Sequence, residues 1–202
     1  MLTLYVTRHG ETEWNIEKRL QGWKNSNLTE KGRRNAILLA NRLQNTKFDA
    51  IYSSPSERAI QTAEIIKQQR SICIFKDDNL REIHLGEWEG QTQEQLEQQF
   101  PHEYFAFWNT PHLYTTETGE TFFDIEKRVD TFLQSVAKHH KTGTVLVVSH
   151  SVWIKVLLAK CKNVPIKQLW QPPYIHDTSL TIMTISGNDY NMIVEGDISH
   201  RE

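Results

Sequence analysis

The sequence predicts a three-layer α/β/α sandwich with a mostly parallel central sheet and a small helical cap insertion, because strand-like apolar runs alternate with helical patterns along its 202 residues. The run Thr144–Val148 does not alternate with polar residues and is rich in β-branched side chains, as expected of a strand covered on both faces. Arginine or histidine follows closely after three of the apolar runs. Since ligands bind beyond the carboxyl ends of strands in such sheets, the pattern also predicts which edge carries a site.

The first half of the chain reads as strands alternating with helices. The expected strands are Leu2–Val6 and Ala50–Tyr52, with Ile72–Phe75 as a further candidate. Thr29 is placed to cap the first helix, whose apolar residues recur at helical spacing. The segment Ser54-Pro55-Ser56-Glu57 has the spacing of a capping box and a proline at the first helical position, which predicts the start of the second helix.

The second half continues the alternation. Thr121-Phe122-Phe123-Asp124 again has the capping-box spacing, and the helix after it carries apolar residues at helical intervals. The strand over Thr144–Val148 is followed by a helix to about Lys160. Leu180–Ile185 and Met192–Val194 are expected to be the closing strands.

Length and charge narrow the class of protein. The length suits one domain over residues 1–202, with a cap-like insertion at about residues 83–120, since no repeat, low-complexity tract or linker divides the chain. The 23 Lys and Arg residues nearly balance the 25 Asp and Glu residues, and no basic patch dominates. Nucleic acid is therefore not expected as a partner.

Cysteine usage and the apolar stretches predict a cytoplasmic protein. Cys73 and Cys161 each lie in an apolar stretch, which predicts buried free thiols rather than a disulfide. His150 and Lys155 interrupt the apolar stretch Val145–Ala159, so no membrane partner is expected. The N-terminus enters a strand-like run at once, without the pattern of a secretory signal. A reduced, cytoplasmic compartment is the resulting expectation.

Arginines and histidines are expected to meet at the carboxyl edge of the sheet. Arg8-His9 follows the first strand, Arg58 lies in the first turn of the helix after the second, and His150 follows the strand Val145–Val148. A guanidinium offers a planar set of donors that matches a phosphate, and an imidazole can act as nucleophile or base. The interpretation is that Arg8 holds a phosphoryl group while His9 attacks it, and that Gly10 lets the backbone approach closely.

Five ordered blocks of short motifs cover most of the chain. They are Thr7-Arg8-His9-Gly10-Glu11-Thr12 with Asn15 and Gln21-Gly22; Leu28-Thr29-Glu30-Lys31-Gly32; Tyr52-Ser53-Ser54-Pro55 with Arg58, Thr62 and Ala63; Leu80-Arg81-Glu82-Ile83 with Gly86-Glu87-Trp88-Glu89-Gly90; and Val148-Ser149-His150. Together they resemble the motifs of the histidine phosphatase superfamily, also called phosphoglycerate mutase-like. The particular residues in these motifs are most similar to those of the small broad-specificity phosphatases of that superfamily.

The resemblance implies a metal-independent, cofactor-free hydrolysis of small phosphate monoesters in two steps. His9 would become phosphohistidine, and Glu82 would protonate the leaving oxygen and then activate water, releasing inorganic phosphate. The resemblance gives the remaining residues binding roles. Arg8, Arg58 and His150 would hold the phosphoryl oxygens, and Asn15, Gln21, Gly22 and a backbone N–H near Thr178 would complete the pocket.

Two positions depart from the family's pattern. Ser151 stands where glycine usually follows the second histidine. A serine there would weaken the site if the backbone needs positive φ or a tight approach to phosphate, or it could add a hydroxyl donor. Asp177 precedes Thr178-Ser179, where relatives often carry asparagine. A carboxylate near phosphate would be unfavourable unless it faces away.

The segment after Glu82 bears on the choice between phosphatase and mutase. From Ile83 to Glu126 there is no Lys or Arg, whereas a mutase acting on doubly phosphorylated glycerate must hold a second phosphate. Aromatic residues gather there instead, and Phe100–Gly119 is expected to form a small cap that favours apolar or aromatic leaving groups. Arg19 and Lys24 remain as a second anion site on the other rim.

Two alternatives stay open: a cofactor-dependent phosphoglycerate mutase-type phosphotransferase, and a non-catalytic phosphate-binding regulator on the same fold. Trp108, His112 and Trp153 are predicted to lie near substrate, with Trp23 and His176 as further candidates. Core packing is an equal alternative for the tryptophans. The histidines lack the spacing of metal ligands, so no metal site is expected.

Overall fold

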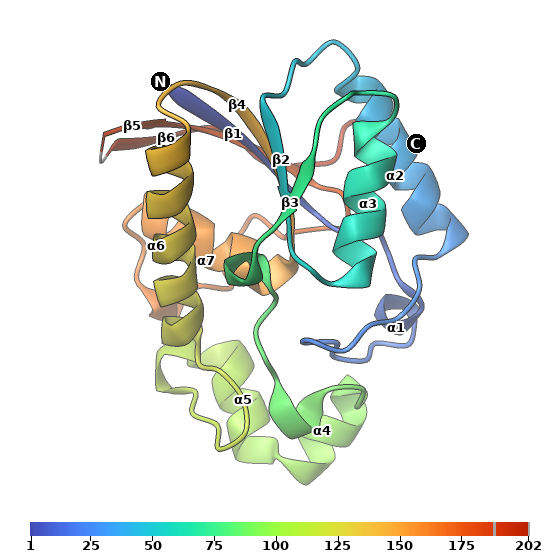
Figure 1. Cartoon of the computed structure of the whole chain (residues 1–202). Helices are drawn as coiled ribbons and strands as arrows, with labels where there is room; N and C mark the ends of the chain where they lie inside the picture. Colours follow the sequence, from blue (N-terminus) through green and yellow to red (C-terminus); the bar gives the residue numbers. More distant parts are fainter. Residues whose placement is uncertain (188, 202) are drawn as a thin grey trace.

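The middle layer of the computed structural model, which describes residues 1–187 and 189–201, is a sheet in the order β3-β2-β4-β1-β5-β6 (Figure 1). β1, β2, β3 and β4 run parallel, whereas β5 is antiparallel to β1, and β6 to β5. The strands are β1 (Leu2–Arg8), β2 (Ala50–Ser53), β3 (Ile74–Lys76), β4 (Gly143–Ser149), β5 (Leu180–Ser186) and β6 (Asp189–Asp197). The predicted mostly parallel sheet is confirmed.

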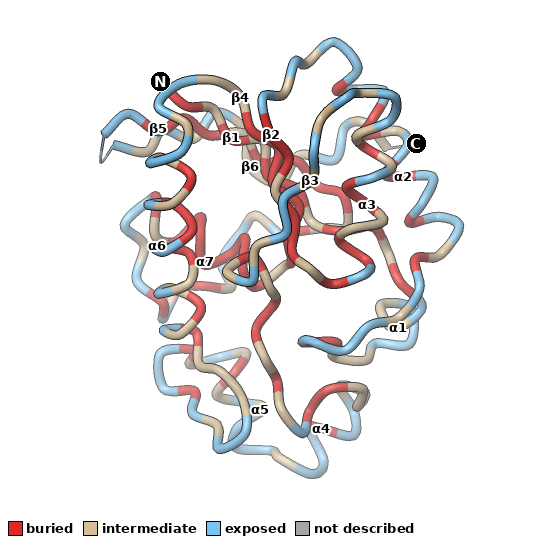
Figure 2. Tube along the Cα trace, in the orientation of Figure 1, coloured by how far each residue is buried: buried red, intermediate tan, exposed pale blue. Residues whose placement is uncertain are grey.

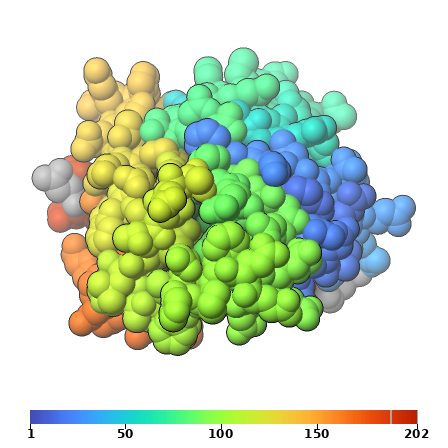
Figure 3. All heavy atoms as spheres, turned by 90° about the horizontal axis from the view of Figure 1, so that it is seen from below, coloured from blue at the N-terminus to red at the C-terminus, as the bar shows by residue number. Residues whose placement is uncertain are grey.

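Helices cover both faces of the sheet, which confirms the three layers. α2 (Glu30–Arg42) and α3 (Glu57–Lys67) lie on one face, and α6 (Phe122–His139) and α7 (Ser151–Cys161) lie on the other (Figure 1). Shorter helices gather at the end of the sheet far from the N-terminus (Figure 1). They are α1 (Glu13–Ile16), α4 (Gln93–Gln99) and α5 (Pro101–Asn109). Seen from that end, residues of about 85–125 occupy much of the surface, beside N-terminal residues (Figure 3).

The core explains why β4 reads as a continuous apolar run. Val145 and Val147 pack in the same cluster as residues of α6 and α7, whereas Leu146 and Val148 pack with residues of α2 and α3. Successive side chains of a strand point to opposite faces, so a strand between two helical layers has to be apolar at every position. Figure 2 accordingly shows the central strands and the inner sides of the helices as buried.

Two of the three predicted helix caps are confirmed. The Thr29 hydroxyl accepts from the N–H of Gly32 at 2.9 Å, and Thr121 forms a capping box with Asp124. The capping box at Ser54 is wrong, because α3 is preceded by Ser56, whose side chain makes no cap hydrogen bond. The physical reason lies elsewhere in the fold: the hydroxyls of Ser54 and Ser56 both contact the ring of His150.

Several local expectations are corrected. Cys161 is buried and free as predicted, but Cys73 is exposed. The strand expected over Ile72–Phe75 starts later, as β3, and it lies at the edge of the sheet, where one side has no neighbouring strand to cover it. Across the two described ranges, no helix is both long and apolar enough to cross a membrane.

Candidate active site

The ends of neighbouring parallel strands bring two histidines together. Arg8 is the last residue of β1 and lies opposite Ser149 of β4, so the next residues, His9 and His150, leave the sheet side by side. The N–H of His9 donates to the carbonyl of Ser149 at 3.0 Å, and the two imidazole centroids are 5.2 Å apart. The strand order thus places both histidines at one edge, as the sequence predicts.

The hydrogen bonds of the His9 ring show which nitrogen carries the proton and which carries the lone pair. Its Nδ1 lies 2.7 Å from the carbonyl oxygen of Gly10, and a carbonyl can only accept, so this nitrogen carries the proton. Nε2 then accepts from Nε of Arg58 at 3.3 Å. Burial, with the positive charges of Arg58 and Arg8, holds the pKa of His9 well below its usual 6.5. His9 is therefore a neutral imidazole at neutral pH, with a lone pair on Nε2.

Gly10 is needed for close packing rather than for an unusual backbone angle. A Cβ added there would lie 2.7 Å from the backbone oxygen of Gly32, at the start of α2. The loop after His9 is thus held against a helix, and this contact fixes the carbonyl that orients the imidazole.

His150 is buried and hydrogen-bonded at both ring nitrogens. Nη2 of Arg58 lies 3.3 Å from its Nδ1, and the Ser54 hydroxyl lies 2.8 Å from its Nε2. Since the guanidinium can only donate, Nδ1 accepts and Nε2 carries the proton. Burial, followed by the charge of Arg58, lowers the pKa of His150 well below 6.5. His150 contacts Arg58 and His9 from behind the cavity described below and is not among the residues that line it.

Lowering the pH should destabilise the protein because both histidines are held neutral. In the unfolded chain these imidazoles take up protons near pH 6.5, whereas in the folded protein their lowered pKa values delay protonation. The unfolded state then binds more protons, so the free energy of unfolding falls as pH drops below about 6.5, by up to about 1.4 kcal/mol per pH unit for each histidine. Urea unfolding at a series of pH values measures this slope. His150→Gln should make the slope shallower, and an unchanged slope in that variant would contradict the assignment.

Arg58 connects the two histidines to the loop before α2. Only 1% of Arg58 is exposed. Nη2 donates to the carbonyl of Gly22 at 2.8 Å, and Nη1 donates to the carbonyl of Lys24 and to Oδ1 of Asn25. Burial lowers its pKa to about 10, so the guanidinium stays charged at neutral pH. It therefore fixes one wall of the site while presenting Nε to His9.

Glycine is required at position 22 by both the backbone and its neighbours. Gly22 has a φ of +51°, and a Cβ there would meet the carboxylate of Glu89. That carboxylate accepts from the N–H groups of Trp23 and Lys24 at 2.8 and 3.2 Å. Glu89 is thus a structural support of the loop that receives Arg58.

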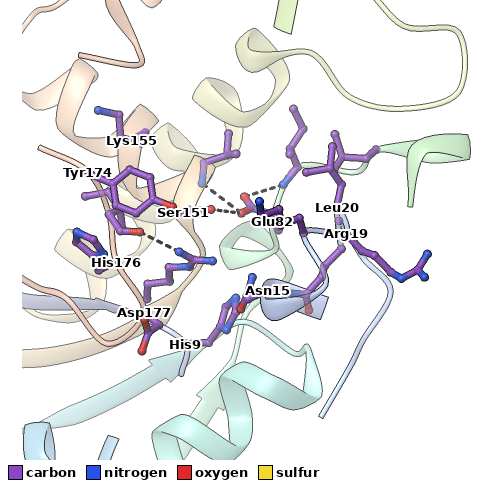
Figure 4. A pocket seen from close by; sticks show the side chains of 18 of the residues that line it. His9, Asn15, Arg19, Leu20, Glu82, Ser151, Lys155, Tyr174, His176 and Asp177 are labelled. Carbon is purple, nitrogen blue, oxygen red and sulfur yellow. Dashed lines mark hydrogen bonds between the residues drawn. The ribbon is translucent and has the colours of Figure 1, made fainter. Parts of the chain in front are cut away.

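Glu82 is held at the amino end of α7. Its Oε2 accepts from the Ser151 hydroxyl at 3.1 Å (Figure 4) and from the N–H of Val152 at 3.2 Å. Its Oε1 accepts from the N–H of Trp153 at 3.3 Å and from the N–H of its neighbour Ile83 at 3.0 Å. These donors at the amino end of the helix fix the orientation of the Glu82 side chain. The side chain is mostly buried, yet it lines the same cavity as His9.

A cavity of about 750 Å³ joins these groups. Four of the five predicted catalytic residues line it, and so do three of the predicted binding residues at the phosphate end. They are Arg8, His9, Arg58 and Glu82, with Asn15, Gln21 and Gly22. Nη1 of Arg8 donates to the carbonyl of Ile175 at 2.9 Å, while its buried Nε has no hydrogen-bond partner within the described ranges. Arg8 thus retains a donor for an anion.

The structure contradicts three predicted substrate contacts. Trp153 is fully buried, and its indole packs on Phe132 and donates to the carbonyl of Asn79. His112 is exposed on a short helix and does not line the cavity. The N–H of Thr178 donates to the carbonyl of Arg8 at 3.1 Å, so it supports the strand end instead of offering a donor to substrate. Trp108 and His176, by contrast, do line the cavity.

The two departures from the family's pattern have structural explanations. Ser151 is the first residue of α7 and does not have a positive φ, so its hydroxyl is a further donor to Glu82. Asp177 lines the cavity but forms an ion pair with Arg201 at 2.7 Å and accepts from Asn35 at 3.0 Å. Burial alone would raise the pKa of Asp177, but the hydrogen bond from Asn35 and the charge of Arg201 outweigh it and lower that pKa. Its negative charge is therefore compensated locally.

Replacing Ser151 with alanine should slow turnover modestly. The change removes one donor to the Glu82 carboxyl group but keeps the three backbone donors, from Ile83, Val152 and Trp153. Losing one of several hydrogen bonds to a charged group predicts a decrease in kcat of about three- to tenfold, with little change in melting temperature. Steady-state kinetics with an aryl phosphate measure it. Ser151→Thr, which retains a hydroxyl, should be near wild type, and equal loss in both variants would contradict this role.

Part of the cavity wall comes from the segment between Trp170 and His176, in which only His176 is predicted from the sequence. Trp170, Tyr174 and Lys155 line the cavity, and the Lys155 ammonium donates to the carbonyls of Gln171 and Pro173 (Figure 4). Tyr174 stacks edge-on against His176, with ring centroids 4.5 Å apart. Two aromatic residues around a Pro-Pro pair were the available signal in the sequence, but no local pattern shows which way they face.

The fold and this site define an α/β protein with a buried histidine pair beside two arginines. Comparison with known proteins identifies the family to which such a protein belongs. The family model of the histidine phosphatase superfamily (branch 1) matches residues 4–197. The chain therefore belongs to this superfamily, and the predicted family and enzyme class are confirmed.

The individual proteins that the chain resembles include some named as phosphatases and others named as phosphoglycerate mutases. The chain is 34% identical to phosphoserine phosphatase 1 of Hydrogenobacter thermophilus, over 84% of this chain and 81% of that protein. Among solved structures, it is similar to Bacillus stearothermophilus YhfR, with a TM-score of 0.97, 48% identity and 99% of each chain covered. It is also similar to a phosphoserine phosphatase of Entamoeba histolytica in complex with 3-phosphoglyceric acid, with a TM-score of 0.88, 27% identity and 99% of each chain covered.

Proposed function

We propose that the protein hydrolyses phosphate monoesters without a metal ion, through a phosphohistidine intermediate on His9. The observation that carries the proposal is the state of His9: a neutral imidazole whose unprotonated Nε2 lies 3.3 Å from the Arg58 guanidinium, in a cavity shared with the Glu82 carboxyl group. A nucleophile needs this free lone pair, and the transferred phosphoryl group needs the positive charge beside it.

The first step transfers the phosphoryl group to the protein. Nε2 of His9 attacks phosphorus, so an N–P bond forms while the bond from phosphorus to the ester oxygen breaks. Glu82 in its protonated form gives its proton to that oxygen, which leaves as an alcohol. The guanidinium groups of Arg8 and Arg58 supply fixed positive charge for the phosphoryl oxygens, and His150 sustains the orientation of Arg58.

The second step regenerates His9. Glu82, now a carboxylate, takes a proton from water, and the water oxygen attacks phosphorus as the N–P bond breaks. Inorganic phosphate leaves, and the proton stays on Glu82 for the next cycle. Asn15 and Gln21 line the cavity and share the Thr12 hydroxyl as a hydrogen-bond partner, so they are suited to shaping the phosphate end of the pocket.

Trapping of the intermediate tests the reaction. The full-length protein is mixed with ³²P-labelled aryl phosphate, quenched in alkaline denaturant and analysed for label that mild acid removes, which is the stability expected of phosphohistidine. Acid-labile label together with release of inorganic phosphate supports the proposal. Turnover with no trapped label under single-turnover conditions would contradict it, and binding of phosphate without any turnover would favour the non-catalytic regulator instead.

We further propose that the enzyme is broad in specificity and favours monoesters with apolar or aromatic leaving groups. Beyond the phosphate end, the cavity wall is formed by apolar side chains from several elements. They are Leu20, Ile83, Leu85, Phe107, Trp108 and Trp170. Arg19 also lines the cavity, but it pairs with Glu17 and donates to the carbonyl of Gly90, and its guanidinium points away from His9 (Figure 4). A substrate panel containing 3-phosphoglycerate, phosphoserine and aryl phosphates, with and without 2,3-bisphosphoglycerate, separates this specificity from mutase activity.

Replacing Trp108 with alanine should weaken the use of aromatic substrates selectively. The indole packs against Phe107 and Trp170 and lines the cavity, so its removal takes away apolar contact with a leaving group. We expect kcat/KM for 1-naphthyl phosphate to fall about tenfold more than for glycerol phosphate. Phe105→Ala, an exposed aromatic residue on the same helix, is the matched control and should change neither. A loss of the same size for both substrates would contradict the proposed preference.

A further inference from the structure

The segment that carries Glu82 has no regular structure of its own. The short 3₁₀ helix Asp78–Leu80 ends two residues before Glu82, and the chain from residue 81 to residue 85 belongs to neither helix nor strand. Without a ladder of backbone bonds, its buried carbonyl groups need partners from other parts of the molecule. The position of Glu82 therefore depends on the side chains that supply those partners.

One guanidinium on α6 donates to three of these carbonyl groups. Nη1 of Arg128 donates to the carbonyls of Asn79 at 3.1 Å and Arg81 at 2.7 Å, and Nη2 donates to the carbonyl of Glu82 at 3.0 Å. These three carbonyl groups lie within four consecutive residues that end at Glu82. Arg128 does not line the cavity, so it reaches the site only through this main chain.

The remaining donors of Arg128 engage Glu120, which holds the other side of the same segment. Nε donates to Oε1 of Glu120 at 2.9 Å, and Nη2 donates to Oε2 at 2.8 Å. Glu120 Oε2 accepts from the N–H of His84 at 2.8 Å, and its own N–H donates to the carbonyl of His84 at 2.8 Å. All five N–H donors of the guanidinium are thus used, which fixes its plane and the backbone on both sides of Glu82.

We infer that Arg128, braced by Glu120, is a positioning residue for the acid–base group Glu82. The inference rests on the proposed function, in which Glu82 protonates the leaving oxygen. α6 holds the backbone of Glu82 through Arg128, while the amino end of α7 holds its carboxylate through Val152 and Trp153. Without Arg128 the Glu82 carbonyl keeps only the Trp23 indole as a donor, at 2.9 Å, and the Arg81 carbonyl loses its guanidinium donor. The backbone of Glu82 is then held less firmly at the position that proton transfer requires.

A comparison of two leaving groups distinguishes positioning from a merely structural role. Benzyl phosphate releases an alkoxide that needs a proton, whereas p-nitrophenyl phosphate, similar in size, releases a phenolate that is stable as the anion. For Arg128→Met we expect kcat/KM for benzyl phosphate to fall about tenfold more than for p-nitrophenyl phosphate. Arg128→Lys keeps the charge but loses the planar set of donors, so it should show the same selective loss to a smaller degree. Lys127 is an exposed neighbour on the same helix. Lys127→Met should leave the ratio of kcat/KM for benzyl phosphate to kcat/KM for p-nitrophenyl phosphate unchanged.

Glu82→Gln separates failure of this inference from failure of the proposed function. It should lower the same ratio about a hundredfold or more, and adding Arg128→Met to it should lower the ratio no further. An equal loss for both substrates in Arg128→Met, with selective loss in Glu82→Gln, would overturn the positioning role alone. An equal loss in Glu82→Gln would instead overturn Glu82 as the acid. If Arg128→Met does not fold, Arg128→Lys and Glu120→Gln give the same comparison, and unchanged ratios in both would overturn the inference.

Discussion

His9→Ala should abolish turnover and remove the acid-labile label on the protein. His9 supplies the attacking Nε2, and the only other imidazole in contact with Arg58 among the described residues, that of His150, does not line the cavity. No second nucleophile is therefore poised to replace it. We expect kcat to fall on the order of 10⁴-fold or more, since loss of a covalent nucleophile removes the whole reaction path.

The fold should survive this change. His9 is buried and neutral, and its side chain makes hydrogen bonds only to Gly10 and Arg58 among the residues described. Alanine removes the group whose pKa burial lowers, so the melting temperature should stay near that of the wild type or rise at low pH. His139→Ala, an exposed histidine at the end of α6, is the matched control and should retain full activity. Persistent acid-labile label in His9→Ala would move the nucleophile to another residue.

The strand ends explain why much of the site is predictable from sequence. Arg8 and His9 follow one apolar run, Arg58 lies in the first turn of the helix after a second, and His150 follows a third. Apolar runs that alternate with helical patterns indicate buried parallel strands. Parallel neighbours end at one edge, so three local patterns are enough to predict a long-range meeting of side chains. The residues that these strands carry could therefore be placed without knowing any single contact.

The contacts that the sequence does not predict depend on the direction in which a side chain points. Ser54 has the spacing of a helix cap, but its hydroxyl contacts His150, which lies 96 positions away in the sequence. Trp153 lies one turn into the helix after His150, on the side that faces the core rather than the cavity. Arg128 reaches the Glu82 segment from a different helix. Each of these contacts depends on tertiary packing that leaves no pattern in the local sequence.

Replacing Arg58 should produce the second large effect, because this side chain has two functions. Its charge lies at the phosphate end of the cavity. Its Nη1 and Nη2 donors hold the loop from Gly22 to Asn25 against the histidines. Arg58→Lys retains the charge but loses most of these hydrogen bonds, so we expect kcat/KM to fall about 10²-fold. Arg58→Met loses both functions, and we expect about 10³-fold or more, with weaker inhibition by inorganic phosphate. Arg33→Met, at an exposed arginine that donates to Gln61, is the control and should keep full activity.

Arg58 also sets the protonation state of the nucleophile, and this effect can be measured apart from turnover. After burial, the charge of Arg58 is the largest cause that lowers the pKa of His9. In Arg58→Met the pKa of His9 should therefore rise toward 6.5, while burial and Arg8 still hold it below that value. NMR titration of the histidine ring protons measures the change, with the spectrum of His9→Ala identifying the His9 resonance. Because a protonated imidazole has no lone pair for attack, the remaining activity of Arg58→Met should decline at a higher pH than wild-type activity does. An unchanged His9 pKa in this variant would show that burial alone keeps the nucleophile neutral, and that the role of Arg58 is confined to the phosphate and the loop.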